Sequence, residues 1–276
     1  MSSPQGIVLW KGKSLLDGER IMVIATGLSG KSENRKTGAM IQTYILRRDI
    51  HPILARRLGE DKSICGDCKL RECGACYVNL AHGPISVFNA FHDSSYKEFE
   101  SSDIRQFIGK NVRIGSYGEP SAVPFFVWER IANVASKVNG YTHQWKTCDQ
   151  RLKQYCMASV DSIVGYNKEY DQARAMGWRT FRVRENENNP LLPDEFICPA
   201  STEGQAKTNC NNCGACGGLS SRVQKNPTII LHGDVEVMGN WRKRRYVKIM
   251  KAIKNKKRWR KDRKAIEKAF KEVCSM

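Results

Sequence analysis

The chain lacks the features that mark a membrane-bound or exported protein. Its 276 residues contain no apolar run of about 18, the length that a helix needs to cross a bilayer. The first residues, Met-Ser-Ser-Pro-Gln-Gly, also lack the basic and then apolar pattern of a signal peptide. We therefore expect a cytoplasmic protein without a membrane partner.

Acidic residues are few relative to basic ones, and the shortage is uneven. The chain has 28 Asp and Glu against 46 Lys and Arg, a formal net charge of +18. Residues 241–271 hold 16 of the basic side chains and only Asp262 and Glu267, so this segment has a charge of +14 and the rest of the chain +4. Such asymmetry predicts an acidic partner, most simply DNA or RNA.

Cysteine, in contrast, is abundant, with 11 in the chain. Most stand at spacings typical of metal ligands, which indicates a reducing compartment. The first group is Cys65-Gly-Asp-Cys68 followed by Cys73-Gly-Ala-Cys76, two C-x-x-C pairs with four residues between them. Four thiolates this close can fill a tetrahedral zinc site or hold an iron–sulfur cluster. The spacing alone leaves both metals open.

A second cysteine group follows later in the chain. The sequence Cys210-Asn-Asn-Cys213-Gly-Ala-Cys216 places three thiolates within seven residues. Iron–sulfur clusters often take ligands at this spacing and zinc seldom does, so a cluster is favoured, with zinc as the alternative. Cys198, which precedes Pro199, is the expected fourth ligand. Ordinary reduced thiols are predicted for the remaining cysteines, Cys148, Cys156 and Cys274.

Short apolar segments alternate with amphipathic ones over residues 1–232, which predicts an α/β domain. The expected strands are 20–26, 77–80, 111–120, 140–145, 155–161, 179–184, 195–198 and 228–231. The expected helices are 49–58, 102–108, 123–138 and 167–176. Such alternation favours parallel pairing through right-handed crossovers. We therefore predict a partial or complete βα barrel of about eight short parallel strands, with metal-binding cysteine loops at 63–77 and 198–218.

Several residues lie at the C-terminal ends of predicted strands, where a barrel gathers its active-site residues. They are Gly118, Glu119, Pro120, His143, Ser159, Asp161 and Cys198. Glu119 and His143 are candidate catalytic acid or base residues. The alternatives are a helix-capping carboxylate for Glu119 and a hydrogen-bonded core position for His143. Asp161 is expected to bind a ribose hydroxyl or to cap a helix.

Residues 241–276 are predicted to form a basic helical tail. Tyr246, Ile249, Met250 and Ile253 follow the spacing of one helix face. Nucleic acid is the expected partner of the tail, and the alternatives are a solvated cationic face or an anionic membrane surface. Trp259 is placed to stack on a base. The residues expected to contact nucleic acid are Arg242, Lys243, Arg244, Arg245, Lys256, Lys257, Arg258, Trp259, Arg260, Lys261, Arg263 and Lys264.

The order of several segments resembles that of the radical S-adenosylmethionine enzymes. A cysteine group comes first, then a strand ending Ser116-Tyr-Gly-Glu-Pro120, and then Met157–Ser162 followed by Glu169–Gly177. The resemblance covers residues 63–216, and uncharacterised phage- and plasmid-encoded proteins are similar to this layout too. In that family a G-G-E-P turn holds the amino group of the cofactor with its backbone. The resemblance therefore implies S-adenosylmethionine at Gly118, Glu119, Pro120, Ser159 and Asp161. It also implies a 4Fe–4S cluster on the first cysteine group and an auxiliary cluster on the second.

The chain departs from that family in two places. The family's C-x-x-x-C-x-x-C motif supplies three ligands, whereas this chain has four cysteines, and Tyr117 replaces the first glycine of the turn. If Cys73 is not a ligand, the other three would leave one iron open for the cofactor. The leading expectation is an iron–sulfur enzyme of this type acting on or near nucleic acid. The alternative is a non-catalytic nucleic-acid-binding protein, for example in phage or plasmid replication or regulation, with structural zinc sites.

Overall fold

The computed structural model describes residues 6–30, 34–72, 76–160, 168–184 and 187–230, without the side chains of Lys69 and Glu72. The chain divides into two units, Met1–His232 and Gly233–Met276. All described residues belong to the first unit, so the predicted tail lies outside them. None of the described helices is both long enough and apolar enough to cross a bilayer.

A six-stranded sheet forms the N-terminal half of the first unit, with the order β4-β1-β2-β3-β5-β6. Strands β1, β2 and β3 pair antiparallel, whereas β3, β5 and β6 pair in parallel. The short β4 runs parallel to β1 at the edge. The strands are β1 (Gly6–Lys13), β2 (Arg20–Thr26), β3 (Ile41–Arg47), β4 (Lys97–Glu98), β5 (Asn111–Tyr117) and β6 (Lys137–Asn139).

A second sheet of five strands has the order β10-β11-β9-β8-β7, and every pair in it is parallel. Parallel strands need covered faces and read as continuous apolar runs, and β8 and β9 are buried along their whole length. The strands are β7 (Tyr141–Thr142), β8 (Met157–Val160), β9 (Thr180–Arg184), β10 (Glu195–Ile197) and β11 (Asn226–Ile230).

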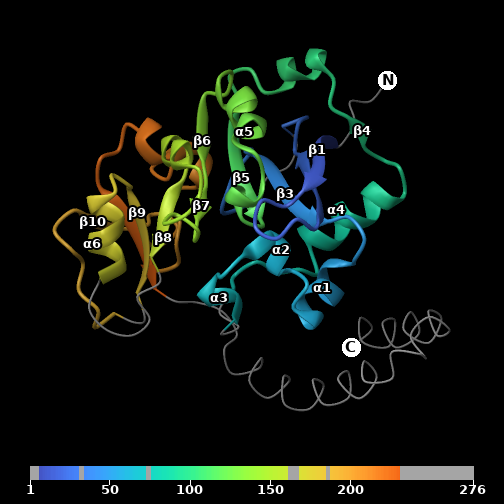
Figure 1. Cartoon of the computed structure of the whole chain (residues 1–276). Coiled ribbons are helices and arrows are strands. Elements are labelled where there is room, and N and C mark those ends of the chain that lie inside the picture. The colour runs from blue at the N-terminus through green and yellow to red at the C-terminus, as the bar shows by residue number, and fades with distance from the viewer. Residues whose placement is uncertain (1–5, 31–33, 73–75, 161–167, 185–186, 231–276) are drawn as a thin grey trace. The chain divides into compact units, whose positions relative to one another are not determined.

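The two sheets meet at a single stretch of chain, because only Gly140 separates β6 from β7 (Figure 1). The Gly140 carbonyl accepts a hydrogen bond from the Met157 amide at 2.9 Å, which attaches β8 at this point. A Cβ on Gly140 would lie 2.5 Å from Ile114 and 2.9 Å from the Cys156 sulfur, so only glycine fits. The passage from one sheet to the other therefore depends on this glycine.

Seven short α-helices connect or cover the described strands. Helix α6 packs against β8 and β9, while α1 and α4 pack together beside β3 (Figure 1). Four 3-10 turns lie at Ser101–Gln106, Pro120–Ala122, Gln150–Gln154 and Gly218–Ser220. The helices are α1 (Pro52–Leu58), α2 (Lys62–Cys65), α3 (Lys69–Glu72), α4 (Gly83–His92), α5 (Phe125–Ala132), α6 (Lys168–Ala175) and α7 (Cys210–Cys213).

The main core is built around three fully buried tryptophans, Trp128, Trp145 and Trp178. The indole N–H of Trp128 donates to the Pro120 carbonyl at 2.9 Å, and that of Trp178 donates to the Gln150 side chain at 3.0 Å. The polar atoms of these two indoles are thus satisfied in the interior, as buried indoles require. A smaller apolar cluster joins Cys68 and Leu70 to Met157, Phe181, Val183, Cys216 and Ile229.

The structure confirms an α/β fold with parallel strand pairs and corrects several predicted elements. Strand β2 is buried as expected but pairs antiparallel with both neighbours. Residues 77–80, predicted as a strand, are irregular, and the helix expected at 123–138 is limited to α5. In place of the helix expected at 102–108, the structure has a 3-10 turn at Ser101–Gln106. Elements that were not predicted are strands β1, β3, β4 and β6 and helices α2, α3, α4 and α7.

Candidate metal centres

The first cysteine group lines an open cavity of about 610 Å³. Cys65 ends α2, Cys68 follows two residues after Gly66, and Cys76 lies beyond the residues that the structure leaves out. The cavity is also lined by the end of β5 from Gly115, by the following Gly118 and Glu119, and by Tyr141 and His143. Three of the four predicted ligands thus face one cavity, while Cys73 lies outside the described residues.

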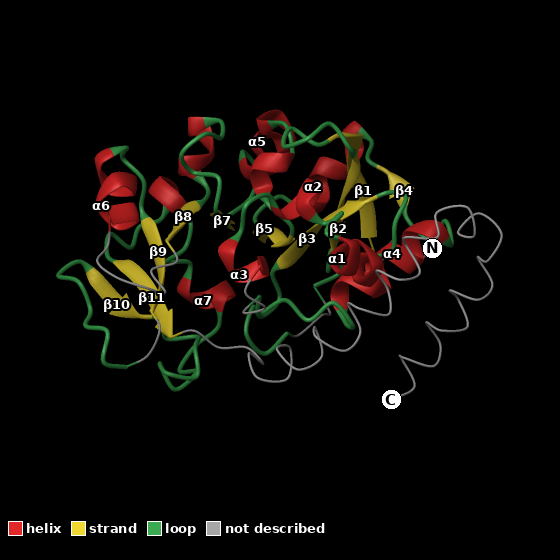
Figure 2. Cartoon of the chain, turned by 60° about the horizontal axis from the view of Figure 1, so that its bottom comes forward, coloured by secondary structure: helices red, strands yellow, loops and turns green. Residues whose placement is uncertain are grey.

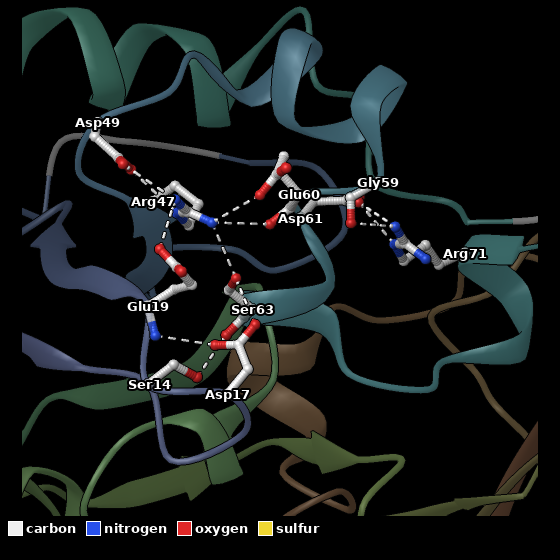
Figure 3. Close-up of polar contacts among 10 residues, drawn as sticks. All are labelled: Ser14, Asp17, Glu19, Arg47, Asp49, Gly59, Glu60, Asp61, Ser63 and Arg71. Carbon is white, nitrogen blue, oxygen red and sulfur yellow. Dashed lines mark hydrogen bonds and ion pairs between the residues drawn. The ribbon is translucent and has the colours of Figure 1, made fainter.

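An ion cluster around Asp61 positions the start of this cysteine loop (Figure 3). The Asp61 carboxylate is 1% exposed and accepts from the Arg71 Nε at 2.8 Å and from Arg56 at 3.4 Å. A buried carboxylate needs such partners, because desolvation of an unpaired charge is costly. The Asp61 carbonyl also accepts a hydrogen bond from the Cys65 amide at 2.9 Å. The ion pairs that hold Asp61 therefore also fix the position of Cys65.

A second polar cluster holds α2 against the N-terminal strands (Figure 3). Buried Arg47 donates to Asp49 at 3.0 Å and to the Ser63 hydroxyl at 3.1 Å, and pairs with Glu19 and Glu60. Ser14 donates to the Ser63 carbonyl at 2.6 Å. Residues 62–65 are therefore fixed from β3 and from the turn after β1, without any covalent link.

The turn after β5 contacts the cysteine loop through its backbone. The Glu119 amide donates to the Ile64 carbonyl at 2.6 Å. Gly118 adopts a φ of +90°, and a Cβ there would lie 2.6 Å from the Ile45 side chain and 2.9 Å from the Ile45 carbonyl oxygen. Only glycine allows the turn to approach β3 and α2 this closely.

Glu119 uses its carboxylate to hold the neighbouring backbone. One oxygen accepts from the Ser121 amide at 3.2 Å and caps the 3-10 turn, and the other accepts from the His143 amide at 2.8 Å. The side chain is buried, with 3% of the residue exposed. The capping alternative for Glu119 is therefore what the structure shows, and the residue also forms part of the cavity wall.

His143 stands between Glu119 and the thiols. Its Nε2 lies 3.5 Å from the Cys68 sulfur, and its Nδ1 lies 3.8 Å from the Glu119 carboxylate. A carboxylate beside the distal nitrogen is the arrangement that orients many metal-ligating histidines. With Cys65, Cys68 and Cys76, the imidazole completes a set of three sulfur donors and one nitrogen donor.

The acidities of these thiols reflect their shared surroundings. Burial raises the pKa of Cys65 well above its ordinary value, and Asp61 and the thiols Cys76 and Cys68 add to the increase. Burial likewise raises the pKa of Cys76. Negative charge on one thiolate thus opposes ionisation of its neighbours, as expected for acidic groups that share a site.

The second cysteine group lines a cavity of about 530 Å³, and all four predicted ligands border it: Cys198, Cys210, Cys213 and Cys216. Cys198 follows β10, and its amide donates to the Thr228 carbonyl at 2.9 Å. Helix α7 supplies Cys210 and Cys213, and its N-cap Asn209 accepts from the Asn212 amide at 3.0 Å. Figure 2 shows α7 near α3, and Cys216 belongs to the same apolar cluster as Cys68 and Leu70.

Burial also raises the pKa values of thiols in the second cysteine group. It raises the pKa of Cys216 to about 12, although a hydrogen bond with the Tyr141 side chain acts in the opposite direction. It raises the pKa of Cys198 as well, which Cys210 increases further. The thiols of this group are therefore close enough to influence one another's charge.

Three residues that sequence reasoning did not assign to a metal site form a wall common to both cavities: Tyr77, Arg113 and Tyr141. Lys36 borders the second cavity only. Only Arg113 had a signal in the sequence that could have placed it in a cavity wall. It is a single basic residue between Val112 and Ile114, in a segment otherwise suited to a buried strand.

The remaining predicted residues lie elsewhere. Pro120 begins the 3-10 turn and Ser159 is buried on β8, and neither lines the two cavities. Cys148 and Cys156, which were predicted to be ordinary thiols, also border neither cavity. Asp161, Cys274 and the twelve tail residues expected to bind nucleic acid fall outside the described residues.

In donor type, the described residues that line the two cavities suit a thiolate-bound metal. As placed, they contain no group of three or more His, Cys, Asp or Glu side chains drawn close enough to hold an ion. The thiols would therefore have to close around a metal from the cavity walls. Comparison of the chain with models of known protein families, with curated proteins and with solved structures finds no match.

Proposed function

We propose that the chain is a metal–thiolate protein with two centres, one in each cavity. One observation carries this proposal: the seven described cysteines at metal-type spacing all line the two cavities. The two described cysteines without that spacing, Cys148 and Cys156, line neither.

The function that this arrangement supports best is an iron–sulfur enzyme of the radical S-adenosylmethionine type, on a partial barrel of parallel strands. Cys65, Cys68 and Cys76 would hold the cluster, with Cys73 as a non-ligand. The turn at Gly118 and Glu119 borders the same cavity, where it would receive the cofactor. A reduced cluster supplies the electron that cleaves S-adenosylmethionine. The basic residues of 241–276 would bring nucleic acid to this protein as substrate or neighbour.

In this proposal the protein's own residues position groups rather than transfer protons. The Glu119 carboxylate already accepts two backbone N–H bonds, so it secures the turn and the His143 backbone. The buried Asp61 with its two arginines secures the loop that carries Cys65. These contacts would keep the thiols and the turn beside one cavity.

A structural zinc protein that binds nucleic acid is the second candidate, and one observation favours it. His143 Nε2 lies 3.5 Å from the Cys68 sulfur. Three cysteines and one histidine form a common donor set of closed, structural zinc sites. In this alternative the first centre has no open position and the protein has no redox chemistry.

Metal analysis of anaerobically purified protein tests the proposal. We expect iron and acid-labile sulfide, with broad absorption from cysteine-ligated iron. Cys213→Ser should remove the metal of one centre, whereas Cys156→Ser, a buried thiol away from both cavities, should keep both. Zinc without sulfide, lost from the first centre in His143→Ala, would establish the zinc candidate instead. Protein that binds neither iron nor zinc would refute both candidate functions.

Cofactor cleavage decides whether the first centre is of the radical type. The reduced, reconstituted protein should convert S-adenosylmethionine to 5′-deoxyadenosine, and Cys73→Ala should retain this activity. Cys76→Ala is the matched variant that should lose it. An intact cluster with no cofactor cleavage would exclude the enzyme and leave the binding function.

A further inference from the structure

Arg113 is a buried cation that no carboxylate neutralises among the described residues; its electrostatic neighbours there are thiols and phenols. It lies on β5 between Val112 and Ile114, and it is 8% exposed. Within the described ranges, its guanidinium forms no ion pair with a carboxylate and donates no hydrogen bond. An isolated charge in a protein interior is costly unless an anion offsets it.

Other buried arginines in the described part of the chain show the usual solution. Arg182 pairs with Glu195, with 2.7 Å between Nε and the carboxylate, and Arg184 pairs with Glu203. Arg47 pairs with three carboxylates. Arg179 donates to backbone carbonyls, with 3.1 Å to that of Ala215. Arg113 differs from these four, although it is buried to a similar degree.

The surroundings of Arg113 are the two cysteine cavities, both of which it lines. Its guanidinium carbon lies 5.4 Å from the centre of the Tyr141 ring, a cation–π contact that holds the side chain in place. Tyr141 also lines both cavities. The guanidinium therefore sits in the wall that separates three thiols of the first group from four of the second.

Metal–thiolate centres are anionic. Four thiolates around a divalent zinc ion, as at the second centre, leave a net charge of about −2, and the three thiolates proposed for the first centre leave about −1. A cluster held by the same cysteines is similarly negative. Two such centres in adjoining, partly open cavities would repel each other and would each bear a desolvation cost. We propose that Arg113 is the counter-cation shared by both centres and that it couples their metal affinities; this inference rests on the proposed metal binding.

The test compares Arg113→Met with Arg113→Lys, because the two replacements have similar length and differ in charge. Each replacement is combined with Cys213→Ser, so that zinc binding at the first centre alone is measured. In a second set it is combined with Cys68→Ser, so that zinc binding at the second centre alone is measured. Zinc alone is titrated into the anaerobic reduced protein against a chromophoric chelator. We expect the methionine variant to bind about tenfold or more weakly at both centres, and the lysine variant to remain within a few-fold of the parent.

Circular dichroism of the metal-free variants controls for folding, and Arg113→Gln is a second neutral variant if the methionine variant does not fold. Unchanged affinity at both centres in a folded neutral variant would overturn the inference and would indicate that Arg113 serves another anion, such as a ligand carboxylate. Weakening at one centre only would also overturn the shared role. Absence of metal from the parent protein would refute the proposed function itself, which separates the two failures.

Discussion

At the scale of single residues, Gly118 shows how closely the cavity turn approaches its neighbours. Its positive φ alone would cost an alanine roughly 1–2 kcal/mol. The contacts that a Cβ would make with Ile45, and with the Ile64 carbonyl oxygen at 3.2 Å, are additional, because two of them involve backbone oxygens that cannot move aside easily. The first cavity therefore depends on the absence of one side chain.

Gly118→Ala should destabilise the protein by about 3 kcal/mol or more, as measured by urea unfolding. Gly109→Ala is the matched control, because Gly109 has a φ of +67° but open space around its Cβ position. The control should lose only the conformational part, about 1–2 kcal/mol. Equal losses in the two variants would show that the turn at Gly118 has room for a side chain.

The sequence predicted which cysteines line the cavities, but it predicted few of the other residues that line them. Spacing predicted which thiols gather, because ligands for one ion must lie close in sequence or at strand ends. Arg113 carried no comparable signal, since one basic residue in a strand usually points to solvent. Its burial depends on Tyr141 and on the second sheet, which are contacts between distant parts of the chain.

At the scale of elements, helix α1 depends on a titratable cap. The Nδ1 of His51 accepts from the Ile53 amide at 3.4 Å, and its ring meets Phe88 of α4 edge-on at 5.4 Å. Burial lowers the pKa of His51, and Arg57 lowers it further. Acceptance at Nδ1 requires the neutral ring, so the cap and the depressed pKa agree.

Acid should weaken this element. The unfolded chain takes up the proton near the ordinary pKa of 6.5, before the folded protein does, so stability is present above that pH and falls as pH drops through it. We expect the loss of unfolding free energy between pH 7.5 and 5.5 to be smaller in His51→Asn, by less than about 1 kcal/mol, because solvent screens a half-buried ring. Asparagine keeps a capping oxygen without titrating. Identical pH profiles would rule out His51 as the cause.

The elements themselves were predicted unevenly, for physical reasons. Strands β5, β8, β9, β10 and β11 have short apolar runs followed by turn residues, and the sequence located them. The run of β2 suits any central strand, so its antiparallel pairing with β1 and β3 could not be read from composition. The segment Tyr77–Leu80 has strand-forming residues but borders the cavity, and no partner strand pairs with it in the described structure.

At the scale of the whole molecule, charge separates the first unit from the residues that follow it. Removal of residues 233–276 takes away 16 basic side chains and none of the eight proposed ligands. If six to eight phosphates are contacted, log K for duplex DNA should fall with log salt at a slope of about −5 to −7 in the full chain. The shortened protein should keep its metal and lose most affinity and most of that slope.

A salt titration of both proteins on one labelled oligonucleotide measures this difference. Trp259→Ala is the companion variant, and it should weaken single-strand binding by roughly 1–3 kcal/mol while leaving the slope nearly unchanged. Equal affinities and slopes for the full and shortened chains would mean that the basic segment has no nucleic-acid partner.

The residues that line the two cavities are completed in a fixed order while the chain is being synthesised. Every residue that borders the first cavity has been synthesised once His143 is made, whereas the second waits for Cys216 and Ile229. At roughly 5–20 residues per second, Cys216 follows Arg113 by about 5–20 s. During that interval the nascent chain presents its first thiols and an arginine still lacking its second set of sulfur neighbours. The second site is thus the last part of the unit to be assembled, and its closure marks the completion of the unit.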